Sequence, residues 1–293
     1  MSIEILKLSE VTPADRHVAI GTFDGIHLGH RKVIDAAETV LTFDPHPLMV
    51  INPDAAPKLL TQLPLKARIL ESIGVKQMVL IEFDEQFERI APENFVRHVL
   101  IERLGAKKVS VGENFRFGFK AQGDPRYLST FGEFETRVVT LVEHGGEIVS
   151  STQIRGLVAA GDVQRADELL GYPFTMVGEV MHGDKRGREL GFPTANVIPG
   201  EHDCVPGHGV YAALTNGVPS AVNVGVRPTF GTGRGLLVES HLIGWSGDLY
   251  GQRIEIAFLE RMRGERRYDS AEALAEQMHA DADQAREICA ARR

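Results

Sequence analysis

The segment Gly21-Thr-Phe-Asp-Gly-Ile-His-Leu-Gly-His30 combines residue types that suit phosphate binding. His27 and His30 are three residues apart, so on a helix their imidazoles face the same way. Gly25 and Gly29 carry no side chain that would hold a phosphate chain away from the backbone. Because helix N-termini also attract anions, two imidazoles at a helix start would form a site for a triphosphate.

A simpler interpretation of this segment is a glycine-rich turn with two surface histidines. Glycines, histidines, an acid and a change from strand to helix within ten residues favour the phosphate site instead. The sequence holds neither a Gly-x-x-x-x-Gly-Lys-Ser/Thr nor a Gly-x-Gly-x-x-Gly fingerprint. A phosphate site in this chain must therefore be built in another way.

The segment Ser150-Ser-Thr-Gln-Ile-Arg155 opens a helix later in the same half of the chain. Hydroxyls and unbonded amides at a helix start, with an arginine one turn later, suit a second phosphate-binding site. A capped helix without a ligand explains these residues equally well, so both interpretations stay open.

The segment from Gly178 to Asn196 indicates a nucleotide and metal site in the second half. Its glycines would let a loop fold closely over a nucleotide, and Lys185 could approach a phosphate. Thr194 and Asn196 are two residues apart, so both side chains point to one face of an extended segment. A hydroxyl and an amide oxygen are hard ligands, and magnesium completes its coordination with water and substrate phosphates.

Glu239 lies in the apolar strand Leu236-Leu-Val-Glu-Ser-His-Leu-Ile243, where Leu237 and His241 share its face. A carboxylate among apolar neighbours acts as a base when a hydroxyl lies within hydrogen-bond reach. The alternation alone favours the simpler interpretation, which is a glutamate that faces solvent.

The elements that position the first set of residues alternate between short β-rich runs and helical patterns. This alternation indicates an α/β domain with a parallel sheet and crossover helices. Helices begin at Pro64 and Pro92, because proline favours the first helical turn. Two more helices, over 151–160 and 162–170, close this half. The expected strands are His17–Gly21, Val40–Phe43, Gln77–Phe83, Lys108–Gly112 and Arg137–Val142.

The helix that begins near Leu28 has a pattern that continues to Glu38, and the next strand begins at Val40. A helix-to-strand connection usually takes about 2–6 residues. Either the helix is shorter than its pattern, or residues are missing from the sequence near Ala37–Thr39.

The second half reads as successive short strands with no helix between them, which indicates an antiparallel barrel or sandwich. A terminal helix follows, with Asp269 and Glu272 as its capping pair and Leu274 on its apolar side. The change of pattern places the domain boundary near residue 172. The expected strands are Thr175–Met181, Val210–Thr215, Ala221–Gly225, Leu236–Ile243 and Arg253–Leu259.

The composition of the whole chain argues against several classes of protein. Its 293 residues are enough for two domains, and its net charge of −8 supplies no basic field for nucleic acid. Charges interrupt the N-terminus, and no apolar run is long enough to cross a bilayer. Cys204 and Cys289 are too few for a disulfide framework, so we expect reduced thiols in a soluble, cytoplasmic protein.

The sequence resembles the His-x-Gly-His nucleotidylyltransferases in its histidine segment. In the particular residues of this and other motifs it resembles the bifunctional riboflavin kinase/FAD synthetases. The histidine segment, Thr42-Phe-Asp-Pro-His-Pro47 and Val111-Gly-Glu-Asn-Phe-Arg-Phe-Gly118 carry the likeness in the first half. In the second half, Leu190-Gly-Phe-Pro-Thr-Ala-Asn196 looks like the riboflavin kinase signature, and Val238-Glu-Ser240 matches the family's catalytic base. Asn223–Phe230 is also similar to a family segment. The resemblance covers nearly the whole chain.

The resemblance implies a Rossmann-like nucleotidylyltransferase domain over 1–171 and an antiparallel riboflavin kinase barrel with a terminal helix over 172–293. It implies that His27 and His30 hold ATP phosphates and stabilise charge in adenylyl transfer, and that Glu239 is the base of the kinase. Nucleotide or flavin contacts are implied for Gly21, Phe23, Asp24, Asp44, Asn114, Ser151, Thr152 and Arg155 in the first domain, and for Gly183, Lys185, Gly187, Thr194 and Asn196 in the second. Thr194 and Asn196 would also bind Mg²⁺, whereas Asp44 fits equally well as a turn residue before Pro45.

The implied activity is a pair of reactions, in which ATP phosphorylates riboflavin to FMN and then adenylylates FMN to FAD with release of pyrophosphate. The implied ligands are Mg²⁺, ATP, riboflavin, FMN and FAD. Nucleic acid and membranes are not expected as partners, and a homo-oligomer stays open. Two other functions also stay open: an enzyme with one of the two activities, and a flavin- or nucleotide-binding regulator. The joint presence of the histidines and Glu239 argues against the regulator, because a binder needs no base.

Overall fold

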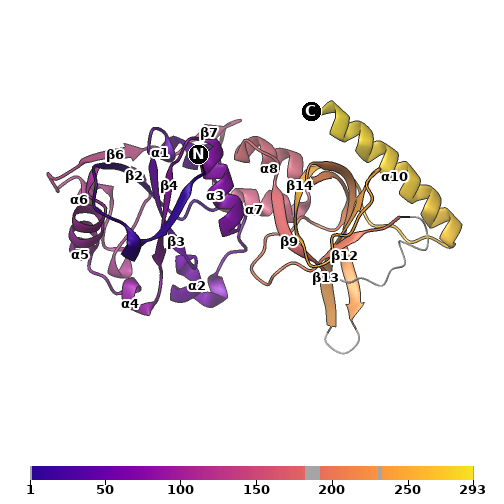
Figure 1. Cartoon of the computed structure of the whole chain (residues 1–293), viewed down its shortest axis with the longest axis horizontal. Helices are drawn as coiled ribbons and strands as arrows, with labels where there is room; N and C mark the ends of the chain where they lie inside the picture. Colours follow the sequence, from indigo (N-terminus) through magenta and orange to yellow (C-terminus); the bar gives the residue numbers. More distant parts are fainter. Residues whose placement is uncertain (1, 182–191, 230–232, 293) are drawn as a thin grey trace. The chain divides into compact units, whose positions relative to one another are not determined.

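Within residues 2–181, 192–229 and 233–292, which the computed structural model describes, a six-stranded sheet comes first (Figure 1). All its strand pairs are parallel, in the order β1-β4-β3-β2-β5-β6, which confirms the expected parallel sheet. Val18, Ala19 and Ile20 of the central strand β2 are buried, as in parallel sheets that are covered on both faces. The strands are β1 (Glu4–Lys7), β2 (Arg16–Ile20), β3 (Thr39–Asp44), β4 (Gln77–Glu82), β5 (Ala106–Gly112) and β6 (Glu135–Val139).

The strand order reverses between β2 and β5. After β2 the chain adds β3 and then β4 on one side, and it returns to place β5 on the other side of β2. Ligands of open parallel sheets bind outside the carboxyl ends of the strands at such a switch point. The Gly21–His30 segment directly follows β2 and Asn114 follows β5, so both lie at this edge.

The helices of this half begin at residues that favour helix starts. Proline occupies the first turn of α2 and α5, and the side chains of Asp84 and Asp124 accept backbone hydrogen bonds at the starts of α4 and α6. The helices are α1 (Leu28–Ile34), α2 (Pro47–Ile51), α3 (Leu63–Ser72), α4 (Glu85–Glu88), α5 (Pro92–Asn94), the π-helical segment η3 (Phe95–Arg103) and α6 (Pro125–Leu128). Short elements complete this half: η1 (Leu8–Glu10), η2 (Pro53–Ala55), η4 (Phe119–Ala121) and the hairpin β7 (Glu143–His144) and β8 (Glu147–Ile148).

The connection between α1 and β3 has an ordinary length, because α1 ends at Ile34 rather than at Glu38. Ala36 reverses the chain with a φ of +63°, and the Ala37 amide donates to the Ile34 carbonyl at 2.8 Å. The helix is therefore shorter than its pattern, which was one of the two explanations, and the connection needs no surface-loop residues beyond those in the sequence near Ala37–Thr39.

Six antiparallel strands close into a barrel in the second half, in the order β10-β13-β12-β11-β14-β9. Thr215 Oγ1 on β11 and Ser240 Oγ on β13 are hydrogen bonded at 2.7 Å, although these strands are not neighbours. Ser240 must therefore point into the barrel, and Glu239, one residue away, points outward. The elements are β9 (Thr175–Met181), β10 (Ala195–Val197), β11 (Gly209–Thr215), β12 (Val218–Thr229), β13 (Gly233–Leu242) and β14 (Arg253–Arg263).

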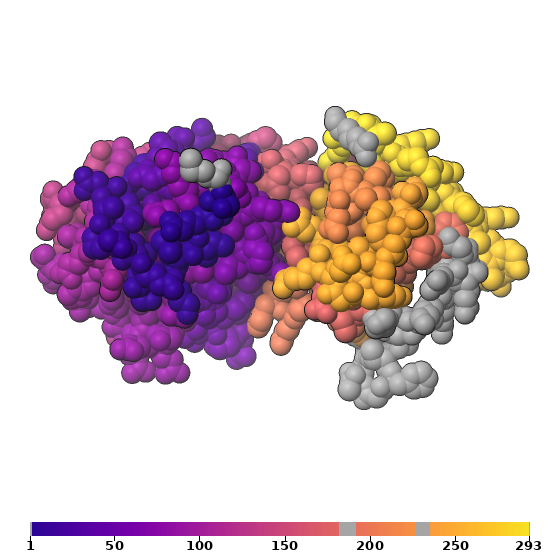
Figure 2. Space-filling view, viewed as in Figure 1, coloured from indigo at the N-terminus to yellow at the C-terminus, as the bar shows by residue number. Residues whose placement is uncertain are grey.

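The terminal helix α10 (Ala271–Ala291) lies along the outside of the barrel, against β11, β12 and β14 (Figures 1 and 2). Ala282, Ala285 and Cys289 form part of its buried face. The N-cap is Ser270, whose hydroxyl accepts the Ala273 amide at 3.1 Å. The expected cap at Asp269 was therefore wrong by one residue.

The chain packs as two units, Met1–Pro57 with Leu63–Ser150, and Lys58–Gln62 with Ser151–Arg293. The helices α7 (Ser151–Ala160) and α8 (Val163–Leu170) thus belong to the barrel's unit, and α8 packs on β14. The expected boundary at residue 172 differs from this packing over 151–170, and the functional boundary stays a prediction. Among the described residues, no helix combines the length and the apolar character of a membrane span.

Candidate active sites

The turn after β2 brings the two predicted histidines together. His27 is the N-cap of α1, and its Nδ1 accepts the backbone amide of His30 at 3.2 Å. Because Nδ1 is an acceptor, a neutral His27 carries its proton on Nε2, which can donate to a phosphate oxygen. The two imidazole rings stack with their centroids 3.6 Å apart. The expectation that both rings share one side of the helix start is confirmed.

The backbone of this turn is strained. Phe23 has a φ of +46° and Ile26 a φ of +36°, and both side chains are buried. A positive φ is costly for non-glycine residues, above all for β-branched isoleucine. Gly25, with a φ of +89°, supplies the one strain-free positive φ within the turn. Other contacts must therefore hold the turn in this shape.

One such contact comes from Lys66 on α3, whose Nζ donates to the Thr22 carbonyl at 2.7 Å. The Thr42 hydroxyl donates to the same carbonyl oxygen at 3.1 Å. Lys66 is only 7% exposed, and burial lowers the pKa of its ammonium, although the carboxylates of Asp24 and Asp44 oppose this shift. A buried amino group with two carboxylates that favour its charged form therefore lies directly behind the histidine turn.

The structure distributes the other predicted residues of the first site over several elements. Asp24 is buried in the turn, Asp44 is exposed at the end of β3, and Asn114 is exposed after β5. Gly21 lies close to the Phe23 ring, since a Cβ atom there would come within 3.0 Å of it. All of these residues follow neighbouring strands, but their contacts to nucleotide or flavin stay predictions.

The three predicted residues of α7 belong to the second unit. Ser151 is half-buried, Thr152 is exposed, and Arg155 Nε donates to the Lys58 carbonyl at 2.8 Å. Arg155 thus holds the strap Lys58–Gln62, which is built into the barrel's unit. Whether these side chains also close on phosphate stays a prediction.

A cavity of about 1250 Å³ on the outside of the barrel is lined by those predicted kinase residues that the structure describes. Thr194, Asn196, Glu239 and His241 all line it, together with residues of α10 and of 245–250. The register explains this arrangement, because Asn196 pairs with Glu239 and Glu239 pairs with Asn223 across three adjacent strands. Directly paired residues project from one face of a sheet.

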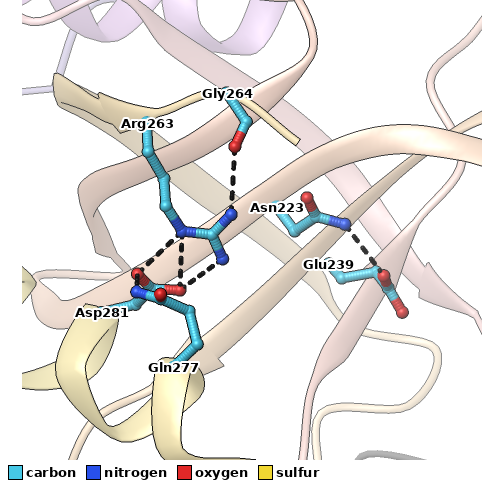
Figure 3. A network of polar contacts seen from close by, with 6 residues as sticks. All are labelled: Asn223, Glu239, Arg263, Gly264, Gln277 and Asp281. Carbon is cyan, nitrogen blue, oxygen red and sulfur yellow. Dashed lines mark hydrogen bonds and ion pairs between the residues drawn. The ribbon is translucent and has the colours of Figure 1, made fainter. Parts of the chain in front are cut away.

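Glu239 is held by its neighbour on β12. Asn223 Nδ2 donates to Glu239 Oε2 at 3.3 Å (Figure 3). Asn196 is 8% exposed, and its Nδ2 donates to the Thr194 carbonyl at 3.2 Å, which leaves its amide oxygen as the atom that suits a cation. Glu239 is half-buried and lines the cavity beside an amide donor, which suits a base, and its role stays a prediction.

The wall of the cavity opposite these strands is fixed by an ion pair between β14 and α10 (Figure 3). Arg263 Nε and Nη2 donate to the two carboxylate oxygens of Asp281 at 2.9 and 2.7 Å, and Gln277 Nε2 donates to Asp281 Oδ1 at 2.9 Å. The side chains of Arg263 and Asp281 are 14% and 6% exposed. The hydrogen bonds to Asp281 raise the pKa of Arg263, so the guanidinium is held in its charged form.

Three predicted residues of the second site, Gly183, Lys185 and Gly187, lie outside the described residues. Among the residues that are described, no cluster of three histidine, cysteine or carboxylate side chains could hold a metal ion. The oxygen donors that the sequence predicted for this site, a hydroxyl, an amide oxygen and a carboxylate on Thr194, Asn196 and Glu239, all line the cavity. These oxygen donors fit Mg²⁺ bound largely through substrate phosphates and water.

Two family models divide the chain in the order of its two sites. The FAD synthetase model matches residues 9–153, and the riboflavin kinase model matches residues 170–289. The bifunctional riboflavin kinase/FMN adenylyltransferase of Escherichia coli K12 is 36% identical, over 97% of this chain and 96% of that protein. The chain belongs to the bifunctional riboflavin kinase/FMN adenylyltransferase family. A family member from Listeria monocytogenes is 35% identical, over 93% of this chain and 92% of its own.

A solved structure supports the fold of this family member. The crystal structure of a protein described as a macrolide-efflux protein from Streptococcus pneumoniae has a TM-score of 0.85 and 28% identity. The match covers 97% of this chain and 99% of that one. The likeness therefore extends over both the parallel sheet and the barrel.

Sequence reasoning assigned no role to four residues of these two sites. Lys66 lay within an expected helix, and Asn223 within a segment similar to the family. Arg263 and Asp281 are a charged pair that meets only when α10 packs on the barrel. A signal for Asn223 was present, because it lies on an expected strand with the same alternation as Glu239.

Proposed function

We propose that this chain converts riboflavin to FMN at the barrel cavity and FMN to FAD at the histidine turn, with ATP consumed in each step. The observation that carries the proposal is the row of Asn196, Glu239 and Asn223 in one cavity, in a chain whose other unit presents His27 and His30 at a sheet switch point. Family membership over nearly the full length supports both activities in one chain.

The cavity residues suit phosphoryl transfer to a hydroxyl. Glu239 would accept the proton of the ribityl hydroxyl as its oxygen attacks the γ-phosphorus of ATP, and ADP would leave. The Asn223 amide, which donates to Glu239 Oε2, orients this carboxylate. Thr194 and Asn196 would hold Mg²⁺, which neutralises charge on the phosphates when it is bound.

The histidine turn suits adenylyl transfer. A phosphate oxygen of FMN would attack the α-phosphorus of ATP, the bond from this phosphorus to the bridging oxygen would break, and pyrophosphate would leave. The phosphate is already a nucleophile, so the step requires no covalent enzyme intermediate. His27 Nε2 and the stacked His30 would stabilise the negative charge that develops on the phosphates.

We infer a cytoplasmic location and no nucleic-acid partner for this enzyme. Both cysteines are free thiols, as is usual in a reducing compartment, and the net charge of −8 opposes binding to a polyanion. Whether copies of the chain form a homo-oligomer is a separate question that sedimentation would answer.

The test is a time course of the purified chain with riboflavin, ATP and Mg²⁺, with the flavins separated by chromatography. FMN should rise first and then give way to FAD, with ADP and pyrophosphate as the other products. A parallel reaction with EDTA in place of Mg²⁺ should show neither conversion. FMN without FAD would leave one activity, and flavin binding without ATP consumption would support a regulator instead.

A further inference from the structure

Lys66 brings a buried amino group to the histidine turn from a helix that carries none of the predicted site residues. We propose that Lys66 is a positioning residue for adenylyl transfer, which holds the turn Thr22–Ile26 in the shape that places His27 at the start of α1. This inference rests on the proposed FMN adenylyltransferase activity of the first unit. It assigns to Lys66 an effect on the rate of that reaction, through the turn and not through contact with ATP.

The turn Thr22–Ile26 is strained. Phe23 and Ile26 both adopt positive φ values that cost free energy, so the turn keeps its shape only while its surroundings impose it. The Thr22 carbonyl stands directly before this strained stretch. It accepts from Lys66 Nζ on α3 and from Thr42 Oγ1 on β3, so two separate elements fix one oxygen atom.

The turn is linked directly to the two histidines. Ile26 directly precedes His27, and its carbonyl accepts from Arg31 Nε at 3.3 Å. His27 in turn caps α1 through the His30 amide, and the two rings stack. A shift of the turn would therefore move His27 Nε2 relative to the phosphate that it contacts.

Burial of the Lys66 amino group is costly. A lysine that is 7% exposed loses most of its hydration, and an apolar side chain would fill the same space at lower cost. Asp24 in the turn and Asp44 at the end of β3 lie close enough to favour the charged form. The amino group thus joins α3 to the turn at the oxygen atom that Thr42 of β3 also contacts, which an apolar side chain could not do.

The experiment compares three variants in the full-length chain. Lys66→Met removes the hydrogen-bond donor and keeps the length of the side chain, Lys66→Arg keeps a donor, and Thr42→Val removes the second donor to the Thr22 carbonyl. Lys76→Met is the matched control, because Lys76 is an exposed lysine of the same unit just after α3. For each variant we would measure kcat and KM for FMN adenylylation, kcat for riboflavin phosphorylation, and the unfolding temperature.

The expected result is a loss of kcat for FAD formation of about 10- to 100-fold in Lys66→Met, with KM for FMN within about twofold, since displacement of a catalytic group affects the transition state most. Lys66→Arg should recover part of the loss, and Thr42→Val should lose less than Lys66→Met. Lys76→Met should match the unmodified chain. Riboflavin phosphorylation should stay unchanged in all four variants, which shows that the barrel's unit is intact.

Three results would overturn the proposal. One is normal kcat for FAD formation in Lys66→Met. A second is a loss that disappears when the assay is run well below the unfolding temperature, because that result would reduce Lys66 to a stabilising residue. A third, which applies even if Lys66→Met does not fold, is normal kcat for FAD formation in Thr42→Val, because the Thr22 carbonyl then loses a donor without effect. If the unmodified chain made no FAD at all, the proposed function would fail instead, and the two failures are thus distinguishable.

Discussion

Asn196 on β10 and Glu239 on β13 are direct cross-strand partners, so an amide and a carboxylate from distant parts of the chain project side by side into one cavity. Asn223 stands opposite Glu239 on the other neighbouring strand and donates to its carboxylate. Three adjacent strands therefore place the proposed base, the amide that donates to it and the proposed cation ligand in a single row. Variants in this row and variants in the histidine turn of the other unit should affect different reactions.

Replacing Glu239 with glutamine should stop the first reaction and spare the second. Glutamine keeps the size of the side chain but cannot take a proton, so kcat for riboflavin phosphorylation should fall by about 100- to 10,000-fold. FAD formation from supplied FMN should be unchanged, since it uses the other unit. Both rates can be followed in one preparation by flavin chromatography, and a parallel loss of the two would contradict the assignment of Glu239.

Replacing His27 with asparagine should have the opposite effect. Asparagine is a good N-cap, so α1 should keep its start while the imidazole is lost. FAD formation should fall by about 100- to 1,000-fold, as when one preorganised donor to a transition state is removed. Riboflavin phosphorylation in the same sample serves as the control. Equal loss of both reactions would refute the division of labour between the two units.

Replacing Arg263 with methionine should weaken the wall of the cavity. It leaves the Asp281 carboxylate buried without its guanidinium, which should lower the free energy of unfolding by about 3–5 kcal/mol and raise KM for riboflavin. The matched control is Arg286→Met, because its partner Asp283 and Arg286 itself are exposed on the same helix. Urea unfolding and kinase kinetics check this prediction, and similar behaviour of the two variants would contradict it.

Asp167 should make the stability of the barrel's unit depend on pH near neutrality. Burial raises the pKa of this carboxyl from 3.8 to about 7, against the opposing effects of the Phe174 amide and of Arg292. Between these two pKa values the folded chain binds more protons than the unfolded chain. The contribution of Asp167 to stability is therefore full below about pH 4 and falls as pH rises toward 7, by about 1.4 kcal/mol per unit at most.

Asp167→Asn tests this dependence, because asparagine keeps an oxygen for the Phe174 amide but does not titrate. The difference in free energy of unfolding between pH 5 and pH 8 should be smaller in the variant than in the unmodified chain. Arg292→Gln should enlarge the difference, since Arg292 stabilises the charged form of Asp167. An identical pH dependence in the unmodified chain and in Asp167→Asn would show that this carboxyl does not titrate in the window.

Much of the fold was predictable from local patterns. The expected strand Thr175–Met181 coincides with β9, and the helix 151–160 with α7, because alternation and capping act over a few neighbouring residues. The strands β1 and β10 were missed. β1 is an edge strand of four residues, and β10 has three, so neither is long enough to show alternation.

The sequence by itself determined the two fold classes, the position of the histidine segment after a strand, and the shared face of Glu239 and His241. These features depend on residues that are close together in the chain. The tertiary structure decided which distant residues complete each site: Lys66 reaches Thr22, Asn223 orients Glu239, and Arg263 pairs with Asp281. Such pairs form only after helices and strands pack, because register and packing bring together side chains whose spacing in the sequence carries no period.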